Sequence, residues 1–386
     1  MILRFSISMV GRVIAALLQV AIYALFARIL GVQGFGVFAT TTSLTLGLMT
    51  FAEMGMGARL LRGDRTHKED ASLTTFGIVR AIVLVAIVPI SIVGAALFNQ
   101  DSLLVTAAAV YVAGEATGDL AVAMLQGAKQ SVSAMIVLCV RRVLVLLALV
   151  TLPASTSVYT ACFAGGTAGV LILGFFVLKR RARPRNVIVV IRENLGIIVS
   201  GGASSASQFD TVIVGHAAGT IAAGLYGSAT RLFNPINLAV STMLQTFVPE
   251  ISSADSAARI RVFKRVRLVV LSLALAVAIS SMLAPALVNF LYGEEFAEAA
   301  PVAIAVFLCA SLSAVAQVYM AWYYATSMPR CVPILMWASV LLGLAGIWLL
   351  SGYFGILGAA VGLFALHLLS TAAVIIPWRS SLKGSQ

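Results

Sequence analysis

Several charged side chains lie inside long apolar stretches of this sequence, where a charge needs a partner or a ligand. The four cations of most interest are Arg80, Arg141, Arg142 and Arg231, and the three acids are Glu115, Asp119 and Asp210. A charge at the centre of a membrane helix costs roughly 2.5–3.5 kcal/mol on insertion scales, so such residues face a bundle interior, a wet cavity or each other. Because the planar arginine fork suits phosphate oxygens, the cations predict an anion site. The acids predict coupling-ion binding or ion pairing.

The spacing of two acids and two arginines predicts a contact inside one helical hairpin. Glu115 and Asp119 lie four residues apart, so they share a helix face. The turn to the next helix centres near Lys129, with Glu115 fourteen residues before it and Arg142 thirteen after it. An ion pair between these two is therefore expected at one depth. Adjacent helix residues point about 100° apart, so Arg141 and Arg142 cannot both meet one carboxylate in the same way. One of them is expected to face a cavity.

The first half of the chain carries the larger cationic excess within its apolar stretches. It holds five arginines against three acids, whereas the second half holds Arg231 against Asp210. The first half is therefore the predicted anion site. Asp210 follows Gln208 and a run of serines, so it either binds a coupling proton or cation or pairs with Arg231. The sequence leaves both alternatives open.

The composition is that of a membrane protein. Hydrophobic residues make up 61% of the 386 residues and charged residues only 10%, against about 25% in soluble domains. The net charge of +12 would suggest a nucleic-acid partner if the cations formed a stripe on a soluble domain, but they fall mostly in short gaps between apolar runs. The four cysteines show no metal-ligand spacing, so neither a metal nor another cofactor is expected.

Twelve apolar spans are predicted, since about 20 residues are needed to cross the hydrocarbon core. Met1 to Ala27 is read as the first retained helix rather than as a cleaved signal peptide. The spans lie near residues 9–30, 37–57, 73–98, 103–125, 132–152, 158–178, 194–215, 222–246, 268–290, 301–325, 331–351 and 355–377.

Alternate gaps between these spans differ sharply in charge. One set contains no Lys or Arg: residues 31–36, 99–102, 153–157, 216–221, 291–300 and 352–354. The other set, with the two termini, holds 20 of the 26 cations: Arg4, Arg59, Arg62, Arg65, Lys68, Lys129, Lys179, Arg180, Arg181, Arg183, Arg185, Arg192, Arg259, Arg261, Lys264, Arg265, Arg267, Arg330, Arg379 and Lys383. Because Lys and Arg stay on the cytoplasmic side during insertion, both termini are predicted to be cytoplasmic.

The chain also predicts two similar halves. A shift of 188 residues places Gly31, Gly36 and Phe38 on Gly219, Gly224 and Tyr226, within a shared pattern G-x-x-[GA]-x-G-[VL]-[FY]. We expect an N-terminal six-helix lobe at 1–178, a basic cytoplasmic linker at 179–193 and a C-terminal six-helix lobe at 194–386. Six spans is an even number, so the lobes are parallel repeats. Such bundles suit transport by rocking one lobe against the other.

Four segments together resemble a known family of membrane proteins. They are A-R-I-L-G-V-Q-G-F-G-V-F (27–38), F-A-E-M-G-M-G (51–57), F-D-T-V-I-V-G…G-T-I-A-A-G-L-Y-G-S-A-T-R-L (209–232) and L-Y-G-E-E-F-A-E-A-A-P-V (291–302). Their order and spacing resemble those of Wzx-type polysaccharide flippases of the MOP superfamily, which also holds MATE exporters and lipid II flippases. The resemblance covers essentially the whole chain. It implies an all-α, MATE-like bundle of twelve helices in two lobes.

The resemblance also implies a function. It is the movement of an undecaprenyl-pyrophosphate-linked oligosaccharide from the cytoplasmic to the outer leaflet of a bacterial plasma membrane, without enzyme chemistry. Expected partners are the bilayer, that lipid-linked sugar, a polysaccharide polymerase and assembly proteins, with no nucleic acid. A multidrug or small-molecule exporter of the same superfamily is the main alternative. A membrane polymerase or ligase of lipid-linked sugars would need a larger external loop than the roughly ten residues available, and a non-transporting scaffold would not explain the buried arginines.

Overall fold

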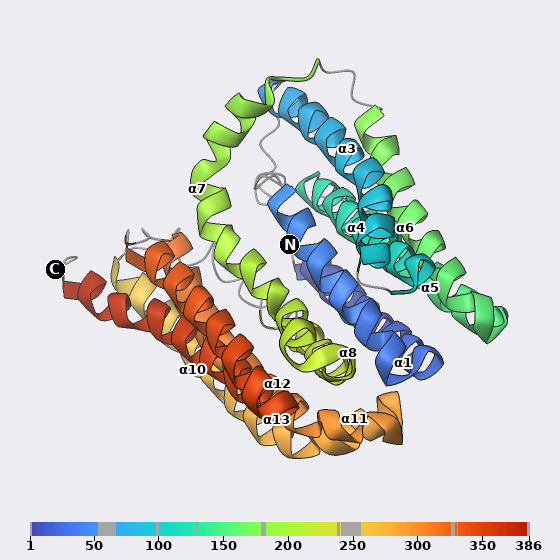
Figure 1. The fold of residues 1–386 in the computed structure, drawn as a ribbon. Helices are drawn as coiled ribbons and strands as arrows, with labels where there is room; N and C mark the ends of the chain where they lie inside the picture. Colours follow the sequence, from blue (N-terminus) through green and yellow to red (C-terminus); the bar gives the residue numbers. More distant parts are fainter. Residues whose placement is uncertain are drawn as a thin grey trace. The chain divides into compact units, whose positions relative to one another are not determined.

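A computed structural model describes residues 2–52, 67–97, 100–128, 130–178, 183–237, 240, 256–325, 329 and 331–383. Several residues used above lie outside these ranges: Glu53, Arg59, Arg62, Arg65, Lys129, Lys179, Arg180, Arg181 and Arg330, together with most of the segment 51–57. The described residues are almost entirely helical (Figure 1). The predicted all-α class is confirmed.

Within the described residues, nine helical stretches are long and apolar enough to cross a membrane. The helices in chain order are α1 (Ile2–Ala52), α3 (His67–Leu97), α4 (Ser102–Gly127), α5 (Ser131–Thr151), α6 (Ala154–Leu178), α7 (Val187–Ala206), α8 (Asp210–Thr230), α10 (Ser256–Ser280), α11 (Ala284–Tyr292), α12 (Ala300–Ala325) and α13 (Cys331–Lys383), with 3₁₀ turns at Ser207–Phe209, Ser281–Leu283 and Glu294–Ala299. The chain is therefore a multi-pass membrane protein.

The chain forms two compact units, which are described separately. The first unit comprises Met1–Leu30 and Val37–Val212, and the second comprises Gly31–Gly36 and Ile213–Gln386. The short segment Gly31–Gly36 lies inside α1 by sequence but belongs to the second unit by its contacts. The lobe boundaries predicted at 178 and 194 are therefore taken up again below as a proposal.

In the first unit, α1 contains two helices joined at a kink. Gly31 has a φ of 66° and a ψ of 178°, a combination that essentially only glycine adopts. The two arms fold back on each other, since the Phe38 ring lies 4.9 Å from that of Phe26 and 6.4 Å from that of Tyr23. Tyr111 of α4 joins this cluster at 5.8 Å from Phe26. One continuous helical label thus covers two packed helical arms.

Helix α4 is the centre of the first unit, where it packs against α3, α5 and α6 (Figure 1). It begins at Asp101, whose Oδ1 atom accepts hydrogen bonds from the backbone N–H groups of Leu103 and Leu104. Its approach to α6 requires glycine on both helices. A Cβ atom at Gly114 would collide with the Gly166 backbone, and one at Gly169 with the Gly114 carbonyl. Small residues give membrane helices this backbone contact.

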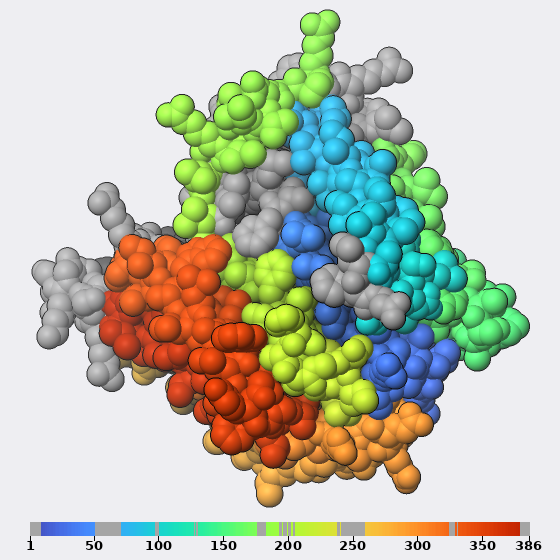
Figure 2. Space-filling view, viewed as in Figure 1, coloured from blue at the N-terminus to red at the C-terminus, as the bar shows by residue number. Residues whose placement is uncertain are grey.

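Helix α3 illustrates the lipid-facing side of the first unit. Its exposed side chains include Ile78, Ile82, Val85 and Ile90, and the light-blue surface of α3 is open along much of its length in Figure 2. Exposed apolar residues on this scale are expected to contact lipid rather than water. At the other end of the unit, the Thr75 hydroxyl accepts from the Arg185 N–H at 2.6 Å and donates to the Arg185 carbonyl at 2.8 Å.

The second unit contains α10, α12 and α13, which pack together. Helix α13 is kinked at Gly355, and its two arms fold back into an antiparallel pair. A Cβ atom at Gly362 would meet Ile347, and one at Gly343 would meet Leu366. The Ser339 hydroxyl also donates to the Leu369 carbonyl at 3.2 Å. A 53-residue helical label thus covers a helical hairpin.

The second unit also contains a close helix crossing that follows the internal repeat. A Cβ atom at Gly36 would collide with the carbonyl of Thr220, and one at Gly224 would collide with the carbonyl of Val32. The shift of 188 residues relates Val32 to Thr220 and Gly36 to Gly224. The contact is therefore self-complementary, as contacts across a two-fold axis are.

The kinks obey the same repeat. Gly219 in α8 has a φ of 89° and a ψ of 173°, close to the values at Gly31, from which it is separated by the same 188 residues. The backbone thus adopts the same unusual conformation at two positions paired by sequence alone. This agreement supports the interpretation that the two halves are structural repeats.

Candidate functional site

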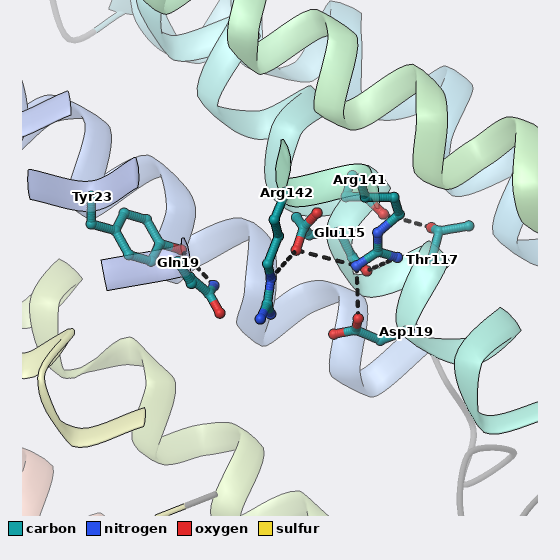
Figure 3. Close-up of polar contacts among 8 residues, drawn as sticks. Gln19, Tyr23, Glu115, Thr117, Asp119, Arg141 and Arg142 are labelled. Atoms are coloured by element: carbon teal, nitrogen blue, oxygen red, sulfur yellow. Dashed lines mark hydrogen bonds and ion pairs between the residues drawn. The ribbon is translucent and has the colours of Figure 1, made fainter. Parts of the chain in front are cut away.

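The α4–α5 hairpin of the first unit brings the two predicted acids and two predicted arginines together. Arg141 is fully buried, and its Nη2 atom donates to Asp119 Oδ1 at 2.8 Å and to Glu115 Oε2 at 3.2 Å. Its Nη1 atom donates to the Glu115 backbone carbonyl at 3.3 Å. Arg141 therefore ties α5 to α4 through two carboxylates and one carbonyl (Figure 3).

Arg142 has a much looser contact. Its Nε atom lies 3.9 Å from Glu115 Oε2, which is an ion-pair distance but too long for a hydrogen bond. No residue in the described part of the chain accepts a hydrogen bond from its buried Nε atom. Arg142 is only 8% exposed, so its charge is largely removed from water. The two arginines thus meet one carboxylate unequally, as their 100° separation around the helix predicts.

The close contact of Arg141 with α4 depends on a missing side chain. A Cβ atom at Gly118 would collide with the Arg141 guanidinium. Gly118 lies one helical turn after Gly114, the residue that admits α6. The spacing Gly-x-x-x-Gly therefore gives α4 two close contacts, one with a helix backbone and one with a buried cation.

Arg80 of α3 is also almost fully buried, and it joins three helices. Its Nη1 atom donates to the Met49 carbonyl of α1 at 2.8 Å, and its Nε atom donates to the Thr117 hydroxyl of α4 at 3.2 Å. Its guanidinium carbon lies 5.9 Å from the centre of the Phe76 ring. These contacts use the cation to bridge helices within the first unit.

Other polar groups of α1 lie in the region of the Arg142 side chain. Gln19 donates to the Tyr23 hydroxyl at 3.4 Å, and Figure 3 shows the Arg142 guanidinium extending away from Arg141, on the side where this pair lies. Arg12 donates to Gln126 of α4 at 3.1 Å. Polar side chains of α1 therefore accompany the charged residues of α4 and α5.

The remaining predicted residues lie elsewhere in the fold. Asp210 begins α8 in the first unit, is half-buried, and accepts from the backbone N–H of Thr211 through its Oδ1 atom at 2.5 Å. Arg231 follows the end of α8 in the second unit and is half-buried. Both alternatives for Asp210, coupling-ion binding and pairing with Arg231, stay predictions. In the ranges that the structure covers, no group of three or more His, Cys, Asp or Glu side chains is placed to hold a metal.

Sequence reasoning missed the residues that support these charges. Thr117, Gly118 and the Met49 carbonyl determine where Arg80 and Arg141 can lie. The Gly114–Gly118 spacing was a visible signal of close packing. Nothing in the sequence identified Thr117 or Met49, because a hydroxyl or a carbonyl becomes a ligand only through the helix packed beside it.

The chain matches a family of sequences described as polysaccharide biosynthesis protein over residues 4–255. No curated protein sequence matches the chain. The matched region includes α3 to α6 and thus the whole charged group of α4 and α5.

Solved structures of transporters share the fold. The lipid II flippase MurJ in an inward closed conformation is similar with a TM-score of 0.73 and 13% identity, over 98% of this chain and 88% of that one. The MATE multidrug transporter DinF-BH gives 0.69 and 17%, over 97% and 94%. An inward-facing MATE family transporter of the MOP superfamily gives 0.67 and 14%, over 99% and 94%. At these identities the similarity concerns the fold.

The family match covers well over half of the sequence, and the fold is that of the MurJ and MATE structures of the MOP superfamily. The predicted Wzx-like, MATE-like resemblance is thereby confirmed. This chain is a multi-pass membrane protein that belongs to the polysaccharide biosynthesis protein family.

Proposed function

We propose that the protein is a flippase that moves an undecaprenyl-pyrophosphate-linked oligosaccharide from the cytoplasmic to the outer leaflet of the bacterial plasma membrane. The observation that carries the proposal is Arg142, a buried cation on a membrane helix whose fork makes no hydrogen bond to any residue that the structure describes. A buried charge in this state is costly. A function that supplies an anion gives the residue its reason.

The arginines divide into two roles in this proposal. Arg142 would hold a phosphate, because a guanidinium fork forms short, charge-assisted bonds with phosphate oxygens. Arg141 and Arg80 are already bonded to neighbouring helices, so we assign them to holding the bundle together around that site. Arg231 is proposed as a further cation for the headgroup, and Asp210 as the candidate for a coupling proton or cation.

The hairpins in α1 and α13 support twelve membrane crossings. The two stretches of 42 and 48 apolar residues are about twice the roughly 20 residues that one crossing needs, and each folds back at a glycine. We propose two six-helix lobes at 1–178 and 194–386 around a basic cytoplasmic linker, with both termini in the cytoplasm. The cation-rich gaps favour this orientation.

An exporter of small molecules is the second candidate, favoured by the similarity to MATE multidrug transporters. The two functions differ in the charge that they require inside the bundle. A cavity for cationic drugs should be acidic, whereas the first unit places Arg80, Arg141 and Arg142 beside Glu115 and Asp119. The excess of cations favours the flippase.

The test uses cells that lack this protein, complemented with wild type or variants. Lipid-linked oligosaccharides are extracted after treatment of spheroplasts with an impermeant glycosidase. We expect protected units to accumulate without the protein and with Arg142→Gln, but not with Arg192→Gln, which makes the same change at an exposed arginine. Unprotected units in the deletion strain would rule out the flippase. Unchanged lipid-linked sugars together with lost drug resistance would establish the exporter.

A further inference from the structure

Glu115 is shared by two arginines that hold it very differently. Its Oε2 atom lies 3.2 Å from Arg141 Nη2 and 3.9 Å from Arg142 Nε. Its other oxygen, Oε1, is buried and has no hydrogen-bond partner among the described residues. Arg141 is further secured by Asp119 at 2.8 Å and by the Glu115 carbonyl at 3.3 Å. The strong contact of Glu115 is therefore with Arg141, and its contact with Arg142 is the weak one.

Charge balance explains why the weak contact exists at all. Arg141 and Arg142 contribute two positive charges, and Glu115 and Asp119 contribute two negative ones, so the group is neutral with no ligand bound. Asp119 contacts only Arg141 within the ion pairs of the described residues, which leaves Glu115 as the neutralising charge for Arg142. An uncompensated buried charge is strongly destabilising. Glu115 thus makes an empty Arg142 tolerable without forming a hydrogen bond to it.

We propose that Glu115 is an internal counter-ion of Arg142, which a substrate phosphate displaces and which returns when the phosphate leaves. This inference rests on the proposed function, in which Arg142 binds that phosphate. A phosphate oxygen forms charge-assisted hydrogen bonds of about 2.7–2.9 Å with a guanidinium, so it prevails over a carboxylate at 3.9 Å. Arg141 keeps Glu115 neutralised on its other side after the displacement.

The competition has a consequence for turnover. A transporter must release its cargo, so a binding site whose empty state is already neutralised holds the phosphate less tightly than a bare cation would. Removing the Glu115 charge should raise phosphate affinity and slow release. The opposite changes in affinity and turnover separate this role from a purely structural one, in which both would fall together.

The experiment measures binding of farnesyl pyrophosphate to the purified full-length chain in nanodiscs, by isothermal titration calorimetry. Glu115→Gln keeps the shape of the side chain and its possible bond to Arg141 while removing the charge. We expect it to bind the probe at least about tenfold more tightly than wild type and to export less polymer in cells. Arg142→Gln, alone or with Glu115→Gln, should lose the binding.

Asp119→Asn is the matched control, because it removes the same charge one helical turn away from a residue that contacts Arg141 only. Its side chain is 57% exposed, so its charge is screened by solvent. We expect its affinity to stay within about twofold of wild type. Equal tightening by Asp119→Asn and Glu115→Gln would overturn the specific counter-ion role.

The outcomes also separate this inference from the proposed function. If Arg142→Gln abolishes binding while Glu115→Gln binds like wild type, the counter-ion is wrong and the phosphate site stands. If neither wild type nor Glu115→Gln binds the probe, both fail at this site. Should Glu115→Gln not fold, the wild-type chain still decides. Probe binding must then shift the glutamate carboxylate bands in an infrared difference spectrum with ¹³C-labelled glutamate, and unchanged bands would overturn the displacement.

Discussion

Gly118 shows how one absent side chain positions a charge. Its hydrogen leaves the space that the Arg141 guanidinium fills against α4. Gly118→Ala is expected to cost about 1–3 kcal/mol, the usual range for overpacking a filled site. Thermal unfolding of the purified protein in detergent should show the loss. Gly94→Ala in α3, where no atom lies within 4 Å of the added Cβ, should not. Equal melting temperatures for the two variants would contradict this account of the Arg141 site.

The two neighbouring arginines should respond differently to the same substitution. Arg141→Gln leaves Glu115 and Asp119 without their main partner, and breaking a buried pair costs about 3–5 kcal/mol. We expect the lower end, because Asp119 is more than half exposed. Arg142→Gln removes only the 3.9 Å contact, so it should melt near wild type and yet lose export. Protein level and melting temperature, measured beside polymer export, check this division. Equal destabilisation by both variants would argue against it.

At the scale of helices, glycines determine which elements touch. The crossing in the second unit places Gly36 against Thr220 and Gly224 against Val32, backbone against backbone. Backbone atoms cannot rotate away as the end of a side chain can, so an added methyl group must separate the helices. This is why the segment Gly31–Gly36 belongs with α8 in the second unit although α1 contains it in sequence.

The symmetry of this crossing gives a prediction. Gly36→Ala and Gly224→Ala should each lower the melting temperature by similar amounts, corresponding to about 1–3 kcal/mol. The double variant should cost less than the sum, because the first methyl group has already parted the same two helices. Gly346→Ala in α13, with open space around the added atom, is the matched control. Additive losses at Gly36 and Gly224 would indicate two separate contacts and no shared crossing.

At the scale of the whole molecule, the proposed topology predicts which turns face which side. Tyr353 lies at the turn of α13 and is 81% exposed, in a gap without cations. Arg183 is exposed in the basic linker before α7. In a chain without its native cysteines, Tyr353→Cys should react with an impermeant maleimide added to intact spheroplasts. Arg183→Cys should react only after permeabilisation. Labelling of Arg183→Cys from outside would reverse the proposed orientation.

The sequence by itself determined that the chain is helical, that it crosses a membrane many times and that its halves repeat. These properties follow from local information: the lengths of the apolar runs, the glycine turns and the cations between them. The kinks at Gly31 and Gly219 were visible for the same reason, since glycine is the residue that such a backbone requires. The depth of Glu115 relative to Arg142 was also predictable, because it needs only the rise along two helices and the position of one turn.

The tertiary structure alone decided how each buried charge is used. Arg141 and Arg142 are adjacent in sequence and identical in chemistry, yet one makes three hydrogen bonds to α4 and the other makes a single contact at 3.9 Å. Arg80 finds its ligands on Met49 and Thr117, which lie on two other helices. No local pattern encodes these differences, because they depend on which helix packs beside each side chain and on which glycine leaves it room.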